Sequence, residues 1–437
     1  IYAPTEAPTP ISPPDGTNIN PNITALILKW ENTLPADNFQ VQIDNDSDFN
    51  SPENDVFVYD NEYQPVGLWD TVWYWRVRQF SGGENSAWSQ VWSFRVDTVP
   101  PAAPAMVSPV DGENLNDNTP LLRWQSVAEN SLPVLYRVWV DNDSDFSSPE
   151  VDSGWIEDNF YQVAIEFTDG VYYLRVGACD NAGNVGDNTE ISFRVDTQAP
   201  PAVSLCEPGD GVWVTENVIL RWTSVDDPSK PVQYRVYISD SPGFLTILYD
   251  SGWITENEWM IYELEMRDYY WKVGVRDDAG NVGDNSTSRL FRVDNTPPEQ
   301  VQLYRPENLQ SVAEGLVRLE WYHADDVGSD VARYWLQVAT DPGFTSLLGA
   351  EYFSPSTPDN LKEAQVTVFY PWDGRYYWRV RAYDRAAPDE PGEWSEVYEL
   401  VIDRVKPLTP SLYLPENGKI TSDNTPYFEW ENVADNT

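Results

Sequence analysis

The sequence repeats one pattern four times and begins it a fifth time. A tryptophan closes a short apolar segment once in each period: Trp30, Trp124, Trp222, Trp321 and Trp430. An aromatic segment keeps step with it, at 73–78, 172–177, 269–274 and 376–381, and so does an exit segment that ends in aspartate, at Asp97, Asp196, Asp294 and Asp403. Successive tryptophans are 94 to 109 residues apart, which is the size of one small domain. The chain is therefore predicted to be a tandem array of domains.

Short proline-bearing linkers follow the exit aspartates and mark the expected boundaries. We predict complete domains over 1–99, 100–198, 199–297 and 298–406, and the first strands of an incomplete fifth over 407–437. Proline restricts its own backbone and biases the preceding residue towards extended conformations. Such linkers are semi-rigid spacers, so the sequence predicts a rod-like array.

Each period predicts strands only. Apolar and polar residues alternate with a period of two in segments such as 136–140 and 234–238, which are rich in β-branched and aromatic residues. Turn sequences with glycine bound these segments, for example Asp169-Gly170 and Asp373-Gly374. About seven short strands per hundred residues is typical of a β-sandwich, so the predicted class is all-β.

Composition excludes several functions. The 71 acidic and 27 basic residues give a net charge of −44, which repels nucleic acid and anionic membrane surfaces. The single histidine, His323, argues against zinc, haem and Ser-His-Asp chemistry, and we identify no phosphate-binding loop or nucleophile elbow, so we expect no enzyme. No segment reaches the run of about 20 apolar residues that a transmembrane helix needs, so we expect no membrane insertion.

The two cysteines fall in neighbouring repeats. Cys179 lies late in the second and Cys206 early in the third, positions expected at far ends of their domains. A disulfide needs Cα atoms within about 7 Å, so we expect no bond between them. A cross-link between chains is the alternative.

The repeated residues resemble those of fibronectin type III domains. An aromatic residue follows the repeat tryptophan after about a dozen residues in the pairs Trp124/Tyr136, Trp222/Tyr234 and Trp321/Tyr334, with Phe39 after Trp30. Corner tyrosines would be Tyr172, Tyr269 and Tyr376, and the first repeat departs from the pattern with Trp73. The resemblance implies a tandem array of fibronectin type III-like, immunoglobulin-like β-sandwiches. The exit segments and the Asp-x-Ala-Gly-Asn loops are similar to repeats of large prokaryotic surface proteins.

The exit aspartates are the leading candidate metal ligands. In the surface repeats that this chain resembles, Ca²⁺ often lies at the junctions, which implies a role for Asp97, Asp196, Asp294 and Asp403. Oxygen atoms of an exit aspartate, a backbone carbonyl and a loop carboxylate could converge there. The alternative is an aspartate that caps the turn before proline. Both interpretations stay open.

Two acidic turns are weaker calcium candidates. Alternating aspartates at Asp44, Asp46 and Asp48, and at Asp141, Asp143 and Asp145, resemble the start of a calcium loop, without its glycine and distal glutamate. The third and fourth repeats have ordinary turn sequences at the same place, 239–244 and 340–344, which favours a turn. The loops at 180–188 and 278–285 are also interpreted as turns. Sequons that permit N-glycosylation occur at Asn22, Asn45, Asn142 and Asn285.

Arginine and tryptophan residues predict a stacked ladder in two repeats. Trp88 and Trp92 are expected to interleave with Arg76 and Arg78 through cation–π contacts. A similar set is Arg379, Arg381 and Trp394. We interpret these ladders as structural reinforcement.

The sequence therefore predicts a non-catalytic structural protein. It would be a rod-like segment of an extracellular filament, sheath, surface layer or large adhesin. Partners would be copies of itself or other surface proteins, because the incomplete fifth repeat needs strands from elsewhere. The alternatives are a spacer in a secreted enzyme and a glycan-binding adhesion module.

Overall fold

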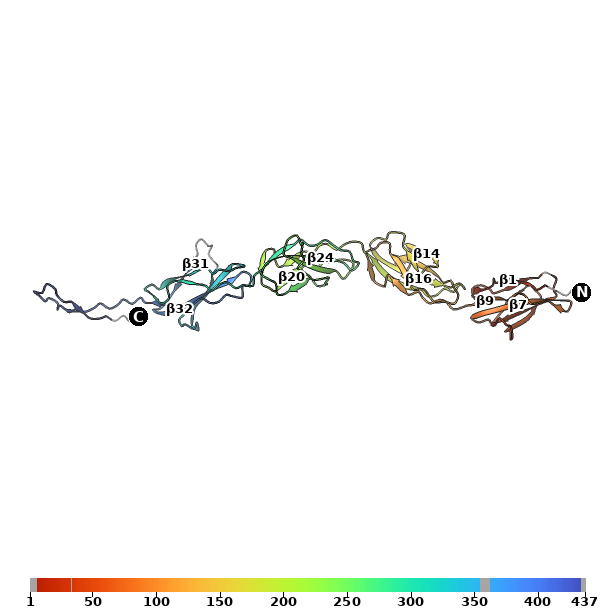
Figure 1. Ribbon diagram of the computed structural model, residues 1–437, viewed down its shortest axis with the longest axis horizontal. Helices are drawn as coiled ribbons and strands as arrows, with labels where there is room; N and C mark the ends of the chain where they lie inside the picture. Colours follow the sequence, from red (N-terminus) through yellow and green to blue (C-terminus); the bar gives the residue numbers. More distant parts are fainter. Residues whose placement is uncertain (1–5, 33, 354–361, 434–437) are drawn as a thin grey trace. The chain divides into compact units, whose positions relative to one another are not determined.

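The chain folds into consecutive β-sandwiches (Figure 1). The computed structural model describes residues 6–32, 34–353 and 362–433, and within them the regular elements are strands without an α-helix. Contacts divide the chain into two compact units. The first comprises Ile1–Pro200, Asp226–Val232 and Arg276–Val282, and the second comprises Pro201–Val225, Gln233–Val275 and Gly283–Thr437.

The first sandwich packs a three-stranded sheet, in the order β1-β3-β6, against a larger sheet in the order β2-β9-β7-β4-β5, with β8 paired to β7. Its strands are β1 (Thr9–Ser12), β2 (Thr17–Ile19), β3 (Leu28–Glu31), β4 (Asn38–Asp44), β5 (Asn54–Val58), β6 (Glu62–Tyr63), β7 (Thr71–Ser81), β8 (Glu84–Asn85) and β9 (Trp92–Val96).

The second sandwich repeats this arrangement with sheets β10-β12-β15 and β11-β17-β16-β13-β14. Its strands are β10 (Met106–Ser108), β11 (Glu113–Leu115), β12 (Leu121–Trp124), β13 (Leu135–Asp141), β14 (Val151–Ile156), β15 (Phe160–Gln162), β16 (Gly170–Cys179) and β17 (Thr189–Val195).

Two more sandwiches of the same order follow, and all of their described residues belong to the second compact unit except 226–232 and 276–282. The third has sheets β18-β20-β23 and β19-β25-β24-β21-β22. Its strands are β18 (Leu205–Glu207), β19 (Val212–Val214), β20 (Val218–Trp222), β21 (Gln233–Ser239), β22 (Tyr249–Asp250), β23 (Glu258–Ile261), β24 (Asp268–Arg276) and β25 (Arg289–Val293).

The fourth sandwich has sheets β26-β28-β31 and β27-β33-β32-β29-β30. Its strands are β26 (Leu303–Arg305), β27 (Gln310–Val312), β28 (Leu316–Tyr322), β29 (Val331–Ala339), β30 (Leu347–Phe353), β31 (Lys362–Phe369), β32 (Gly374–Asp384) and β33 (Tyr398–Ile402).

All four sandwiches have the same topology, which confirms the predicted fold class. In each, the strand that carries the repeat tryptophan pairs antiparallel with the first strand, and the second strand runs parallel to the last, as in β11 and β17. The chain is thus a tandem array of fibronectin type III-like β-sandwiches.

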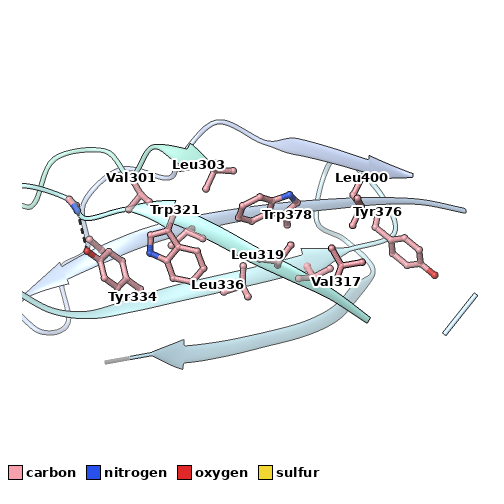
Figure 2. Packing of buried hydrophobic residues seen from close by; sticks show 14 of the residues in the cluster. Val301, Leu303, Val317, Leu319, Trp321, Tyr334, Leu336, Tyr376, Trp378 and Leu400 are labelled. Carbon is pink, nitrogen blue, oxygen red and sulfur yellow. Dashed lines mark hydrogen bonds between the residues drawn. The ribbon is translucent and has the colours of Figure 1, made fainter. Parts of the chain in front are cut away.

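The repeat tryptophans form the centre of the cores. Trp30, Trp124, Trp222 and Trp321 are at most 2% exposed. In the fourth sandwich Trp321 and Trp378 fill the space between the sheets (Figure 2), and the Tyr334 hydroxyl accepts a hydrogen bond of 3.1 Å from the Ala324 amide. Truncation of such a side chain to alanine typically costs about 3–5 kcal/mol, which explains why the position recurs.

The corner residue makes the same bond in every sandwich. The tyrosine hydroxyl donates to the carbonyl four residues earlier: Tyr172 to Thr168 (3.0 Å), Tyr269 to Glu265 (3.2 Å) and Tyr376 to Trp372 (2.9 Å). In the first sandwich the indole N–H of Trp73 donates to the Trp69 carbonyl at 3.0 Å. The departure in sequence therefore preserves the hydrogen bond.

The predicted ladders form around one tryptophan each. The Arg76 and Arg78 guanidinium carbons lie 4.5 and 4.4 Å from the Trp88 ring centroid, and those of Arg379 and Arg381 lie 4.0 and 4.5 Å from that of Trp394. The prediction was wrong for Trp92, whose ring contacts Trp75 and packs against the core.

The start of the fifth repeat consists of β34 (Leu412–Leu414) and β35 (Glu429–Trp430), which pair with each other. Trp430 is 58% exposed, in contrast to its four buried counterparts, because the two strands provide no opposing layer. Both cysteines are free thiols. Cys179 is half-buried and Cys206 is exposed.

Candidate metal centres at the repeat junctions

Each exit aspartate follows the last strand of a larger sheet. Its backbone N–H donates to the parallel strand that pairs with this last strand, for example from Asp196 to the Leu115 carbonyl at 2.8 Å. One carboxylate oxygen accepts the amide N–H two residues later: Val99 (3.1 Å), Gln198 (3.1 Å), Thr296 (3.0 Å) and Val405 (2.9 Å). The proposed turn cap is therefore present in all four copies. In the first three copies, the second oxygen accepts a hydrogen bond from a serine, namely Ser131, Ser229 or Ser329.

In the first compact unit, three buried carboxylates converge. Oxygen atoms of Asp196, Asp227 and Asp277 lie within 4.8 Å of one another, and each residue is at most 6% exposed. Asp227 lies in the loop after β20, and Asp277 directly follows β24. The Ser229 hydroxyl donates to Asp196 Oδ2 at 2.6 Å, and the Ser229 amide donates to Asp227 Oδ1 at 2.9 Å. A serine thus holds two of the three carboxylates together.

Asn281 fixes the third carboxylate. Its backbone N–H donates to Asp277 Oδ1 at 2.8 Å, and its side-chain amide donates to Asp277 Oδ2 at 2.7 Å. The same amide donates to the backbone carbonyl of Asp196 at 2.7 Å. The Asp-x-Ala-Gly-Asn loop is therefore both a turn and the support of a carboxylate.

A second trio lies in the other compact unit. Oxygen atoms of Asp294, Asp326 and Asp384 lie within 4.8 Å of one another. The Ser329 amide donates to Asp294 Oδ2 at 2.7 Å, while Oδ1 of Asp326 is buried without a hydrogen-bond partner. A Cβ atom on Gly328 would overlap the Asp294 carboxylate, so a larger residue at this position would displace that carboxylate. A cavity of about 340 Å³, lined in part by Asp294 and Asp384, gives access to the trio.

Burial and mutual repulsion disfavour charge in these trios. Burial raises the pKa of Asp227, and the charges of Asp196 and Asp277 raise it further. Burial likewise raises the pKa of Asp326 and of Asp384, with Asp294 adding to both. Burial also acts to raise the pKa of Asp294, but hydrogen bonds from Thr296 and Ser329 leave it lowered.

A hard divalent cation would reverse this repulsion. Ca²⁺ takes six to eight oxygen ligands from carboxylates, backbone carbonyls and water. The residues at both trios supply carboxylate oxygens, and one oxygen of Asp326 lacks a protein partner. The donor sets therefore fit Ca²⁺ chemically.

The first junction has the same frame without a trio. Asn184 donates to the Asp97 carbonyl at 3.0 Å and to Asp180 Oδ2 at 2.6 Å, and the Ser131 hydroxyl donates to Asp97 Oδ2. Asn20 donates to the side-chain oxygen of Asn184. Among the described residues, neither group of three carboxylates includes Asp97 or Asp403. For Asp403, the residue at the position equivalent to Asp227 is Asp435, which lies outside the described residues.

The weaker candidates cap their own turns. The amides of Asp46, Asp48 and Asn50 donate to the carboxylates of Asp44, Asp46 and Asp48, and the amides of Asp143, Asp145 and Ser147 donate to those of Asp141, Asp143 and Asp145. Neither carboxylate trio of the described chain includes them. The four sequon asparagines, Asn22, Asn45, Asn142 and Asn285, are all exposed.

Two positions of the carboxylate trios escaped the sequence reasoning, although the repeats carried a signal for them. An acid stands five residues after the repeat tryptophan as Glu129, Asp227 and Asp326. Another stands eight residues after the corner tyrosine as Asp180, Asp277 and Asp384. Alignment of the repeats on their aromatic residues exposes both series.

Comparison with known proteins found distant similarity to solved structures alone. No family model matches the sequence, and no curated protein matches it. The similar solved structures include the FN1–FN3 domains of chicken CNTN1, with 16% identity over 70% of this chain and 99% of that one, at a TM-score of 0.31. They also include the fibronectin(III)-like modules of Clostridium thermocellum CbhA, with 14% identity over 46% of this chain and 93% of that one, at a TM-score of 0.30. Strand order and the repeated core positions carry the fold assignment.

No helix among the described residues has the length and apolarity needed to cross a bilayer.

Proposed function

We propose that this chain is a non-catalytic structural segment of an extracellular assembly, in which Ca²⁺ stiffens the junctions between sandwiches. Fibronectin type III-like modules occur in extracellular structural, adhesion and enzyme-linker proteins. The observation that carries the proposal is the pair of carboxylate trios, built from equivalent positions of successive repeats. Bound Ca²⁺ would join the exit strand of one sandwich to two loops of the next.

The physical gain comes from turning repulsion into a cross-link. Without a cation, each trio is destabilised by buried like charges. A ligand that binds only the folded state stabilises it by about 2.7 kcal/mol at one hundred times its Kd. The array would then be stiff where calcium is abundant, as outside cells, and looser where calcium is scarce.

Calorimetry and solution scattering test this proposal on the full chain. In 1 mM Ca²⁺ we expect a higher melting temperature and a stiffer particle than in EDTA, with two ions bound per chain by isothermal titration. Mg²⁺ at the same concentration is the control, because it prefers a smaller octahedral site and retains its water. Equal melting and scattering with Ca²⁺ and EDTA would refute the proposal.

Self-association is the second part of the proposal and separates it from its alternative. A segment of a filament, sheath, surface layer or large adhesin is expected to associate with copies of itself in Ca²⁺. A spacer in a secreted enzyme is expected to stay monomeric while binding the same ions. Sedimentation velocity over a range of protein and Ca²⁺ concentrations distinguishes them, and a monomer throughout would favour the spacer.

A further inference from the structure

The first sandwich contains a groove of about 750 Å³ that takes no part in the junction sites. Residues in three segments line it, 21–26, 64–70 and 96–98, and we call it the Trp69 groove. Leu26 and Val96, both buried core residues, contribute to its floor. The groove is therefore open to solvent on one side and anchored on the core on the other.

An indole ring forms a wall of the Trp69 groove. The Trp69 side chain is 51% exposed, and its ring stands edge-on to Trp73 with centroids 4.5 Å apart and an interplanar angle of 70°. Trp73 is fully buried, and its indole N–H is bonded to the Trp69 carbonyl. These contacts hold the ring in place before any ligand arrives, so binding costs little further ordering of this side chain.

Polar groups surround the mouth. Asn22, Gln64, Asp70 and Thr98 all line the groove. Thr98 donates to Asp70 Oδ1 from its backbone N–H at 3.2 Å and from its hydroxyl at 3.0 Å. The backbone N–H of Asn22 donates to Asn20 Oδ1 at 2.8 Å. The rim thus offers the side-chain amides of Asn22 and Gln64 and a carboxylate, Asp70, that is held in place by Thr98.

We propose that the Trp69 groove binds a neutral oligosaccharide. A pyranose ring has an apolar C–H face that packs on an indole, and equatorial hydroxyls that both donate and accept hydrogen bonds. An aromatic wall with a few placed amide and carboxylate groups matches those two surfaces. The net charge of −44 disfavours anionic ligands at the same place. This site is independent of the junction cations and goes beyond the structural role proposed above.

A longer turn in the first repeat forms one side of the Trp69 groove. Trp30 lies eleven residues after Ile19, whereas Trp124 lies nine residues after the equivalent Leu115. The added length forms the 21–26 side of the groove. In the fourth sandwich Trp372 occupies the corner position equivalent to Trp69 and is 71% exposed, so it offers a matched control.

Isothermal titration on the full chain, made in a host without N-glycosylation so that Asn22 is bare, tests the proposal. The probes are cellohexaose, maltohexaose and chitohexaose, each titrated in Ca²⁺ and in EDTA. We expect at least one probe to bind with a Kd below about 1 mM, equally with and without Ca²⁺. Trp69→Ala should weaken that binding at least about tenfold, and Gln64→Ala by about threefold, because each removes one contact surface.

Trp372→Ala is the control and should leave the Kd unchanged. Absence of binding for all three probes would overturn the proposal, and so would an equal loss in Trp372→Ala, which would indicate adhesion to any exposed indole. Circular dichroism checks that Trp69→Ala folds, and Gln64→Ala, an exposed substitution, decides the matter if it does not. Loss of calcium binding without loss of sugar binding would leave this inference standing.

Discussion

The junctions that open the second and third repeats share one frame but carry different charge. In both, an asparagine holds the loop carboxylate and donates to the backbone carbonyl of the exit aspartate: Asn184 with Asp180 and Asp97, and Asn281 with Asp277 and Asp196. In both, a serine hydroxyl donates to the exit aspartate. Only the later junction brings a third buried carboxylate, Asp227, into the group.

One side chain accounts for the difference. Glu129 stands where Asp227 stands, and its carboxylate accepts the amide of the adjacent Asn130 at 2.6 Å. The amide of Asn20 then completes the earlier junction with a neutral hydrogen bond. The same backbone frame therefore supports either a two-carboxylate junction, in which Asp97 and Asp180 are bonded to protein groups, or a junction with a carboxylate trio, where we propose that an ion binds.

The largest expected effect comes from Asp227→Asn, because its sign depends on calcium. In EDTA the substitution removes one of three mutually repelling charges, so the melting temperature should rise. In Ca²⁺ it removes a ligand, so the Kd of one site should rise at least about tenfold and the melting temperature should fall. Calorimetry in the two conditions measures both.

The matched control is Glu129→Gln at the two-carboxylate junction. It should change neither calcium binding nor the difference between the two melting curves. A fall in melting temperature for Asp227→Asn in both conditions would show that Asp227 is only a structural hydrogen-bond acceptor.

The reverse substitution, Glu129→Asp, should convert the two-carboxylate junction into a third calcium site. The shorter side chain is expected to leave Asn130 and to turn towards Asp97 and Asp180, as Asp227 is turned towards Asp196 and Asp277. Isothermal titration should then report three calcium ions per chain in place of two. If the count stays at two, the amides of Asn20 and Asn184 suffice to exclude the ion, and the comparison rests on them rather than on residue 129.

The junctions with a carboxylate trio should also differ from the two-carboxylate junction in the pH dependence of their stability. Folding raises the pKa of Asp227, Asp326 and Asp384 above the ordinary value of 3.8. Their contribution to stability is thus fully present below pH 3.8 and is lost as pH rises through the raised values. With saturating Ca²⁺ the ionised forms are favoured, so the stabilisation by Ca²⁺ should grow over the same interval.

Melting temperatures from pH 4 to 7.5 in EDTA and in Ca²⁺ measure this divergence. The same curves are recorded for the triple variant Asp227→Asn, Asp326→Asn and Asp384→Asn. Subtracting its curve from that of the unchanged chain removes the pH dependence that all other carboxyl groups contribute. A gap between the two curves that narrows as pH rises would contradict the assignment of these acids as ligands.

The sequence predicted the fold well because each repeat encodes its own core. Trp222 and Tyr234 recur with their spacing because they pack on each other within one sandwich. The failure at Trp92 has a local cause. Residues 86–91 form no strand, so the period-two alternation that would place Trp92 beside Trp88 is broken, and Trp92 pairs with Trp75 in β7.

The carboxylate trios were only half predictable for a different reason. The exit aspartates stand out in one repeat, but Asp227 and Asp277, on two loops of one sandwich, meet Asp196 only where these loops lie against the exit strand of the preceding sandwich. Moreover, Asp277 lies in a sequence that correctly predicts a turn, and the turn conceals its second role. Contacts across a junction depend on both repeats and are not encoded in either alone.

The smallest expected effect comes from Asn20→Ala, which alters the two-carboxylate junction alone. Asn20→Ala removes the donor to Asn184 Oδ1 and leaves a buried acceptor without its partner, which typically costs about 1–3 kcal/mol. The loss should be equal in Ca²⁺ and EDTA, because no ion takes part. Asn116→Ala, at the equivalent place in the next repeat, is the matched control, and denaturant unfolding measures both variants. If Asn20→Ala destabilised the chain only in EDTA, the first junction would also bind an ion, and the distinction between the two junctions would be one of affinity rather than of kind.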